Sequence, residues 1–433
     1  MKHVTSHILS ITVALMAATA SLLSCADPWE YGGGYGYVTE VEGESENPGG
    51  RSPQELTRRV MLLYSAGYTV NISSFLSDDI EELMTGWLPE GKSFAKDVVL
   101  VYTHLPARSG GLNAPSSPIL LRLYEGPGGK VVSDTLKVYA PGTVSASASQ
   151  LNEVLSYIYD EYPARGYGMI MSSHGSGYLP EGFLNKPDDY VYQPDLKMQK
   201  SFGADYNGSI YTMREIEIQD MAEAIPMHLD YLLFDACYMG CVEVAYELRE
   251  KCDFIGFSQA EVLAEGFCYS SLTEHLLLSD EPDPVAVCRE YFEQYDILSG
   301  INRSATVSMV DCRRMEPLAE VCRRLFDAYR DEMNALEGWN VQGYYRYDSH
   351  WFYDLQDILL KSGISESEKV ELQDALDECI VYKASTPGFM IGAAGFDIDI
   401  FSGFSMYLPA DGHPELDKFY RTLQWNESTG LVQ

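Results

Sequence analysis

Two short stretches of this sequence place a thiol and an imidazole in matching local contexts. Residues 231–234 are an apolar run that continues into Asp235-Ala-Cys237, and residues 168–173 are a second run that ends in His174 within a glycine-rich turn. Each run is typical of a strand buried on both faces of a parallel sheet. Ligands bind at the carboxyl edge of such a sheet, and a cysteine and a histidine there are the parts of a thiol–imidazole nucleophile.

This pair can attack a carbonyl carbon and then release the product. We expect Cys237 to be the nucleophile and His174 the general acid–base, with the backbone N–H groups of Gly175 and Cys237 stabilising the oxyanion. A helix is expected over residues 243–250, just after Cys237, and thiols near helix N-termini ionise easily. A buried cysteine or a loop histidine alone is ordinarily structural, whereas the pair in matching contexts favours catalysis.

The same residues resemble a known family. The blocks Ser173-His-Gly-Ser-Gly177 and Phe234-Asp-Ala-Cys-Tyr-Met-Gly240, with Glu243 following, are similar to those of the clostripain family of cysteine peptidases. Weaker similarity extends over most of residues 58–410, in the stretches 64–67, 78–84, 215–224 and 402–409. The resemblance implies the caspase-like α/β/α sandwich that gingipains and legumain share, and cleavage of peptides after Arg or Lys.

Acidic residues near Cys237 predict the pocket for that basic side chain. Asp235 lies two residues before Cys237, and residues two apart in a strand face the same side. The resemblance implies that this aspartate is the acid of the pocket; the alternative is a structural carboxylate bonded to loop amides. Glu261 and Glu265 follow the next expected strand and are further substrate-binding candidates.

A long polar interval separates the two catalytic candidates. Residues 178–203 contain Lys186, Lys197 and Lys200, and long surface loops are sensitive to proteolysis. The resemblance implies self-cleavage between His174 and Cys237, with these three lysines as candidate sites. The alternative is an ordinary surface loop.

The N-terminus has the features of an export signal. A basic residue precedes an apolar run over residues 8–23, as in a secretory signal. The ending Leu22-Leu-Ser-Cys25 resembles a bacterial lipoprotein signal, which implies lipidation of Cys25; the alternative is an ordinary signal peptide. We expect a signal over residues 1–24, a flexible tether over 25–55, and an exported, membrane-anchored lipoprotein at a periplasmic or cell-surface face.

Composition limits the partners. The 433 residues include 30 Lys and Arg against 64 Asp and Glu, so the formal net charge is −34. Such a surface repels nucleic acid and anionic lipid headgroups. We therefore expect no nucleic-acid partner. The resemblance implies protein or peptide substrates containing Arg or Lys, and we expect a monomer.

Cysteine and acidic residues give little sign of a metal site. Eight cysteines follow Cys25 without a C-x-x-C pair, so zinc is not expected. A single disulfide stays open, because an exported protein can form one. Thiol chemistry requires no cofactor. The family resemblance allows Ca²⁺, for which Asp397 and Asp399 are candidates, but two carboxylates are too few to argue a site.

Strand and helix signals alternate along residues 56–312, which we expect to form the peptidase core. The alternation predicts an α/β fold with a mostly parallel sheet covered on both faces. Residues 313–433 are expected to form a C-terminal helical region with late strands. The expected strands are residues 60–64, 97–104, 119–124, 130–138, 168–174, 231–234, 254–258, 305–310, 389–394 and 403–408, and the expected helices are 77–84 (with acids in its first turn), 147–159, 215–224, 315–335, 352–361 and 366–383.

Two other functions are alternatives to a peptidase. An α/β-hydrolase is disfavoured because the chain has no G-x-S-x-G nucleophile elbow. The stronger alternative is a lipid-anchored binding protein on a catalytically degenerate peptidase scaffold, since a fold does not guarantee a function.

Overall fold

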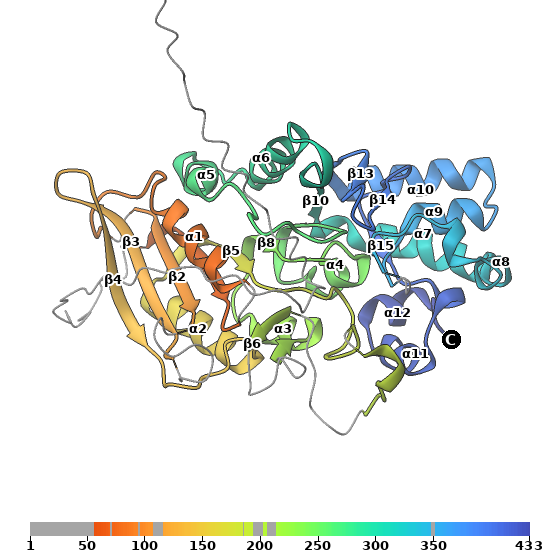
Figure 1. Ribbon diagram of the computed structural model, residues 1–433, viewed down its shortest axis with the longest axis horizontal. Coiled ribbons are helices and arrows are strands. Elements are labelled where there is room, and N and C mark those ends of the chain that lie inside the picture. Colours follow the sequence, from red (N-terminus) through yellow and green to blue (C-terminus); the bar gives the residue numbers. More distant parts are fainter. Residues whose placement is uncertain are drawn as a thin grey trace, which may run out of the picture.

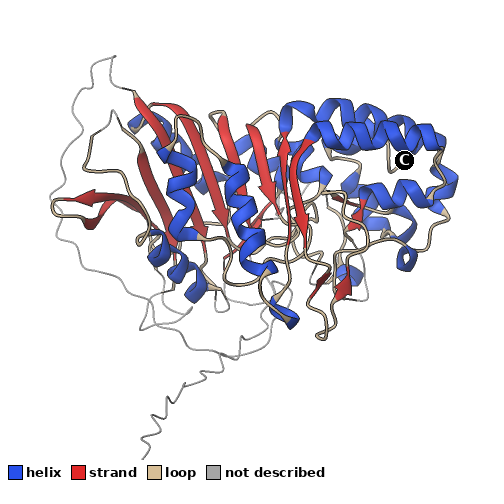
Figure 2. Ribbon diagram, turned by 90° about the horizontal axis from the view of Figure 1, so that it is seen from above, coloured by secondary structure: helices blue, strands red, loops and turns tan. Residues whose placement is uncertain are grey.

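The centre of the molecule is a sheet with helices packed on it (Figure 2). The sheet has nine strands in the order β12-β10-β9-β8-β5-β1-β2-β3-β4. The computed structural model describes residues 56–69, 72–93, 96–106, 116–184, 186–193, 202–205, 214–347 and 351–433. The strands of the sheet are β1 (Thr57–Ala66), β2 (Val98–His104), β3 (Ile119–Gly126), β4 (Lys130–Val138), β5 (Ala164–Ser172), β8 (Leu229–Asp235), β9 (Cys252–Phe257), β10 (Thr306–Asp311) and β12 (Ile380–Ser385).

The five central strands are parallel, and the strands at both edges are antiparallel. β2, β1, β5, β8 and β9 run in one direction. β3 and β4 form a hairpin at one edge, while β10 and β12 close the other. Parallel neighbours place their carboxyl ends at one edge of the sheet, so the predicted α/β class and its mostly parallel sheet are confirmed.

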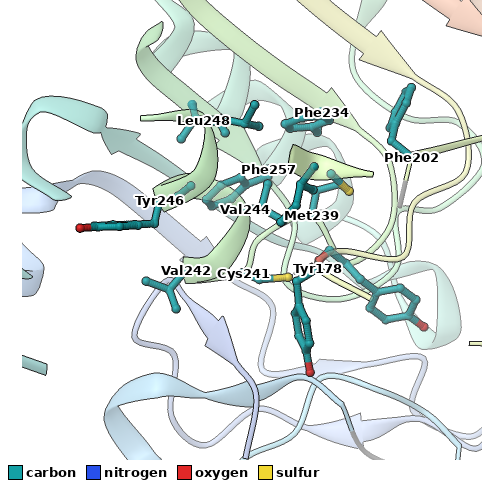
Figure 3. Close-up of a cluster of buried hydrophobic side chains, with 14 of the residues drawn as sticks. Tyr178, Phe202, Phe234, Met239, Cys241, Val242, Val244, Tyr246, Leu248 and Phe257 are labelled. Carbon is teal, nitrogen blue, oxygen red and sulfur yellow. Dashed lines mark hydrogen bonds between the residues drawn. The ribbon is translucent and has the colours of Figure 1, made fainter. Parts of the chain in front are cut away.

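Side chains of the strands alternate between two hydrophobic clusters, one on each face. In β1, Val60 and Leu62 belong to one cluster, whereas Met61 and Leu63 belong to the other. The first cluster is covered by α2 (Ala148–Glu161), α3 (Ile218–Ala224) and α4 (Val242–Leu248), and the second by α1 (Ser73–Leu83), α5 (Tyr269–Thr273) and α6 (Pro284–Asp296) (Figure 1). Figure 3 shows part of the first cluster, with Phe234 of β8 and Val244 of α4.

The C-terminal region packs its helices beside the β12 edge of the sheet (Figure 1). Its helices are α7 (Met315–Ala328), α8 (Arg330–Asn334), α9 (Leu355–Lys361), α10 (Glu366–Cys379), α11 (Pro414–Tyr420) and α12 (Gln424–Thr429). Three short strand pairs lie outside the main sheet: β11 (Tyr353–Asp354) with β15 (Ser405–Met406), β13 (Gly388–Phe389) with β14 (Phe396–Asp397), and β6 (Phe202–Asp205) with β7 (Arg214–Ile216). Among the described helices, none is both long enough and apolar enough to cross a bilayer.

Three details of the expected element pattern are wrong. The helix predicted over 366–383 ends at Cys379, because Ile380–Ser385 pairs with β10 as an edge strand. Residues 215–216 belong to β7 rather than to a helix. The helix predicted over 315–335 breaks into α7 and α8. The domain division after residue 312 stays a prediction; β12 carries a strand from beyond it into the central sheet.

Candidate active site

The register of two neighbouring strands brings the predicted catalytic residues together. Ser172 at the end of β5 pairs with Asp235 at the end of β8, so His174 and Cys237 each lie two residues beyond this pair. The Ser173 N–H donates to the Asp235 carbonyl at 3.3 Å, which extends the pairing past the strand ends. A Cβ on Gly175 would lie only 2.4 Å from the Cys237 carbonyl oxygen. The two turns are therefore in direct contact.

His174 is almost enclosed. Only 8% of its surface is exposed, and burial lowers the pKa of its imidazole to about 4. β6 covers this turn, since the Gly203 N–H donates to the His174 carbonyl at 3.0 Å. At neutral pH the imidazole is uncharged and can accept a proton from a nucleophile.

Cys237 lies between the end of β8 and the N-terminus of α4. Its Sγ accepts a hydrogen bond from the Val262 N–H at 3.3 Å, and a donor aimed at sulfur favours the thiolate. The same sulfur lies 3.8 Å from the Val262 carbonyl oxygen, so one loop residue contacts it through both backbone groups.

One backbone N–H next to Cys237 is excluded as an oxyanion donor because it already donates elsewhere. The Tyr238 N–H is already committed to the Ala260 carbonyl at 2.9 Å. The ideal Cβ position on Gly175 lies 3.2 Å from the Cys237 nitrogen, so these two predicted donors are neighbours. Their role stays a prediction.

Asp235 faces the same loop as the Cys237 sulfur. Its carboxylate accepts hydrogen bonds from the Tyr269 hydroxyl at 2.6 Å and the Phe267 N–H at 3.4 Å. Gly266 has φ +58°, and a Cβ there would lie 2.2 Å from an Asp235 oxygen, so only glycine permits this close approach. Burial raises the pKa of Asp235 to about 6.

A second buried acid, Asp79 of α1, was missed from the sequence. It is 6% exposed. Burial is the largest cause of its raised pKa, and the negative charge of Asp235 is the second. One turn later, Glu82 accepts hydrogen bonds from the Ser270 N–H at 3.2 Å and hydroxyl at 2.8 Å, which holds α1 beside Tyr269. The expectation that these acids occupy the first turn of the helix is wrong, because α1 begins at Ser73.

The sequence did contain a signal for Asp79. Leu76, Ile80 and Leu83 follow the helical spacing of a buried face. Asp79 lies three residues after Leu76 and so falls on that face. A carboxylate at a buried helical position indicates a function or a partner.

The two glutamates proposed for substrate binding have different surroundings. Glu261 is fully buried in an ion pair with Arg346, whose side chain is 6% exposed. Its charge is already compensated, which argues for a structural role. Glu265 is exposed, and its negative charge contributes to the raised pKa of Asp79. Asp235, Asp79 and Glu265 therefore form one acidic group beside the nucleophile.

Only one of the three candidate self-cleavage lysines is described. Lys186 is exposed and precedes Pro187. The adjoining turn is anchored by Phe183, whose ring packs edge-on against Trp351 at 4.9 Å between centroids. Lys197 and Lys200 lie outside the described residues, as does Cys25.

The described residues offer no fit for a metal ion. They contain no group of three or more His, Cys, Asp or Glu side chains arranged to bind one. Asp397 and Asp399 are both exposed and lack a third acidic neighbour. Seven described cysteines are free, and of these only Cys268 is more than marginally exposed.

Comparisons with known proteins identify the family of this chain. The clostripain family matches residues 63–429. Clostripain of Hathewaya histolytica is 24% identical over an alignment of 421 positions, and this alignment covers 82% of this chain and 77% of that protein. The structure of an inactive zymogen C11 protease from Parabacteroides distasonis is 26% identical, with TM-score 0.70, and the match covers 88% of this chain and 99% of that one.

A secreted C11 cysteine protease from Bacteroides thetaiotaomicron, solved with an irreversible peptide inhibitor, shares the fold at 23% identity and TM-score 0.68, over 86% of this chain and 98% of that one. These structures confirm the caspase-like sandwich predicted from the sequence. Because the family match extends from the first strand of the sheet to the last helix, the chain belongs to the clostripain family of cysteine peptidases.

Proposed function

We propose that this protein is an endopeptidase in which Cys237 is the nucleophile and His174 the general acid–base. The observation that carries the proposal is their placement at the same register position on adjacent parallel strands, with the two turns in contact. A substrate amide laid across this edge meets a sulfur and an imidazole together.

The protonation states suit the reaction. The uncharged His174 accepts the thiol proton of reduced Cys237 as sulfur attacks the scissile carbonyl. The resulting imidazolium then protonates the leaving amine, which departs and leaves a thioester. Water attacks that thioester with His174 as the base, and the acid product and free thiol are restored. The N–H groups of Gly175 and Cys237 stabilise each oxyanion.

The acidic group beside Cys237 favours a basic residue before the scissile bond. Asp235 is buried and accepts hydrogen bonds from two donors, which fix its carboxylate. A fixed carboxylate pairs strongly with a cation that displaces water from it. Glu265 adds negative potential to the same place, whereas burial and the neighbouring charges raise the pKa of Asp79 to about 10 and keep that carboxyl protonated at neutral pH. Cleavage after Arg or Lys is the specificity that this chemistry supports.

Self-cleavage between His174 and Cys237 is part of the proposal. The bond after Lys186 joins it to Pro187, whose ring fixes the backbone and removes an N–H that an extended substrate donates. Lys197 and Lys200 have no such neighbour and are the better candidates. Replacing both with Gln should leave the purified protein intact, whereas Lys186→Gln should not change its processing. Cleavage after Lys186 in the wild type would contradict this choice.

We further propose export and lipid anchoring at Cys25, which rest on the N-terminal signal pattern. Mass analysis of the mature N-terminus tests this directly. A lipid-modified Cys25 is expected, and an unmodified N-terminus at any other residue would contradict it.

The deciding experiment measures hydrolysis of a fluorogenic Arg peptide by reduced protein. Cys237→Ala and His174→Ala should each abolish turnover, while Cys268→Ser, which removes the most exposed free thiol described, should retain it. Omitting the reductant should lower the wild-type rate. A folded wild type with no turnover on Arg or Lys peptides would instead favour the degenerate binding protein.

A further inference from the structure

The residue directly after the nucleophile has a backbone conformation that side chains rarely adopt. Tyr238 has φ +60°, one of three non-glycine residues with positive φ among those described. Such a conformation persists only where the surroundings hold it, and it is found more often at functional sites. It sets the direction in which the chain leaves Cys237.

Backbone contacts hold Tyr238 from both sides. Its N–H donates to the Ala260 carbonyl at 2.9 Å, and the Cys241 thiol donates to the Tyr238 carbonyl at 2.8 Å. A Cβ on Gly177 would lie 2.6 Å from that same carbonyl oxygen. The turn is therefore closely packed by the glycine-rich turn of His174. Figure 3 shows Cys241 beside Tyr178, the next residue along that turn.

The ring of Tyr238 is held by the C-terminal region. It stacks on Phe352 with centroids 4.7 Å apart and planes 8° from parallel. Tyr345 meets it edge-on at 5.4 Å. Both partners lie more than a hundred residues after Tyr238 in the sequence, and the ring is fully buried.

A buried ion pair lies beside this ring and reaches the same loop. Arg346 binds Glu261 through two nitrogens, Nε to Oε2 at 2.5 Å and Nη2 to Oε1 at 3.0 Å. Glu261 stands between Ala260, which accepts the Tyr238 N–H, and Val262, which donates to the Cys237 sulfur. Burial, and then the charge of Glu261, raise the pKa of the Tyr238 phenol. A two-point guanidinium–carboxylate contact fixes orientation as well as distance.

We propose that Tyr238, Glu261 and Arg346 form a brace by which the C-terminal region sets the geometry of the nucleophile turn. These three are positioning residues: none touches the substrate, and each acts through the loop and turn that hold Cys237. The proposal rests on the proposed role of Cys237 as nucleophile. It also gives Glu261 a role other than substrate binding.

Four variants test the contributions of the Tyr238 ring, its positive φ and the Glu261–Arg346 ion pair separately. Tyr238→Phe keeps the ring, and Tyr238→Gly tolerates the positive φ but removes the ring. Arg346→Lys keeps the charge but loses the two-point contact, and Glu261→Gln with Arg346→Gln removes both charges together. All should be compared by circular dichroism and melting temperature before assay.

The expected result is a fall in kcat with little change in KM for an Arg peptide. We expect Tyr238→Phe to stay within about twofold of wild type, and Tyr238→Gly, Arg346→Lys and the double variant to lose about tenfold or more. Val287→Ala on α6, which thins the opposite cluster, is the matched control: it should lower the melting temperature and leave kcat unchanged. Folded Tyr238→Gly and Arg346→Lys variants with wild-type kcat would overturn the brace.

A second readout is independent of turnover. The rate at which iodoacetamide alkylates reduced Cys237, followed by peptide mass spectrometry across pH 5–9 (about the range in which a thiol beside a histidine titrates), should change in the same variants. Alkylation of Cys268 is the internal reference. If the wild type does not cleave peptides yet these variants shift the Cys237 profile, the brace stands and the proposed function fails. An unchanged profile in all of them would refute the brace.

Discussion

At the scale of single residues, the site depends on two groups that burial drives in different directions. Burial lowers the pKa of His174 to about 4, so its imidazole is uncharged at neutral pH, and raises the pKa of Asp235 to about 6, so its carboxyl is still ionised there. Sequence alone identified both residues, because each follows a recognisable strand. It did not identify Asp79, whose importance depends on where α1 begins, nor the pairing of Glu261 with Arg346, 85 residues away. Contacts this distant in the chain leave no local pattern.

The lowered pKa of His174 predicts a specific loss of stability in acid. Its folded pKa of about 4 lies below the ordinary 6.5, so its contribution is complete above pH 6.5 and is lost as pH falls through 4. Linkage gives a loss on the order of 2–3 kcal/mol between pH 7 and pH 4.5. In His174→Gln the free energy of unfolding should not show this loss. Urea unfolding of both proteins at the two pH values measures it, and equal losses would contradict it.

The raised pKa of Asp235 predicts a pH dependence of substrate binding. The carboxyl must be ionised to hold a cation, so KM for an Arg peptide should fall as pH rises through about 6. Asp235→Asn should remove this dependence and reduce kcat/KM on the order of a hundredfold. Above the ordinary pKa of an aspartate, the ionised and buried Asp235 lowers the stability of the folded wild type. Asp235→Asn carries no such charge, so its free energy of unfolding at pH 7 should not be lower than that of the wild type. Retained cleavage after Arg would leave Asp235 a structural residue.

At the scale of elements, the parallel core was predictable and the C-terminal region was not. The core strands are uniformly apolar runs that only a doubly covered sheet accommodates. β12 follows α10 with no glycine or proline between them, so nothing local marks the end of the helix. Its strand conformation comes from pairing with β10, and tertiary contacts override local propensity there.

The start of α10 is by contrast locally encoded and gives a stability prediction. The Ser365 hydroxyl accepts from the Glu368 N–H, and the Glu368 carboxylate accepts from the Ser365 N–H, a complete capping box. Ser365→Ala should cost about 1 kcal/mol in the free energy of unfolding. Thermal and urea denaturation measure it. Peptidase activity should be unchanged, because the hydrogen bonds of Ser365 and Glu368 stay within the cap and with Tyr329 of the C-terminal region. An unchanged free energy of unfolding would argue that the cap is not formed.

At the scale of the whole molecule, the expected self-cleavage should not separate the chain into two free parts. A cut in residues 194–200 leaves β5 on one fragment and β8 on the other, and these strands are hydrogen-bonded neighbours in the centre of the sheet. We expect two bands on a denaturing gel and one peak of unchanged size in gel filtration. Separation of the fragments without denaturant would contradict this pairing.

Gly240, three residues past the nucleophile, also accepts hydrogen bonds from the Ser405 N–H at 2.9 Å and hydroxyl at 3.2 Å. Ser405 lies 165 residues after Gly240 in the sequence. A chain truncated before Ser405 therefore loses both donors to this carbonyl, even though every strand that brings His174 and Cys237 together is still present.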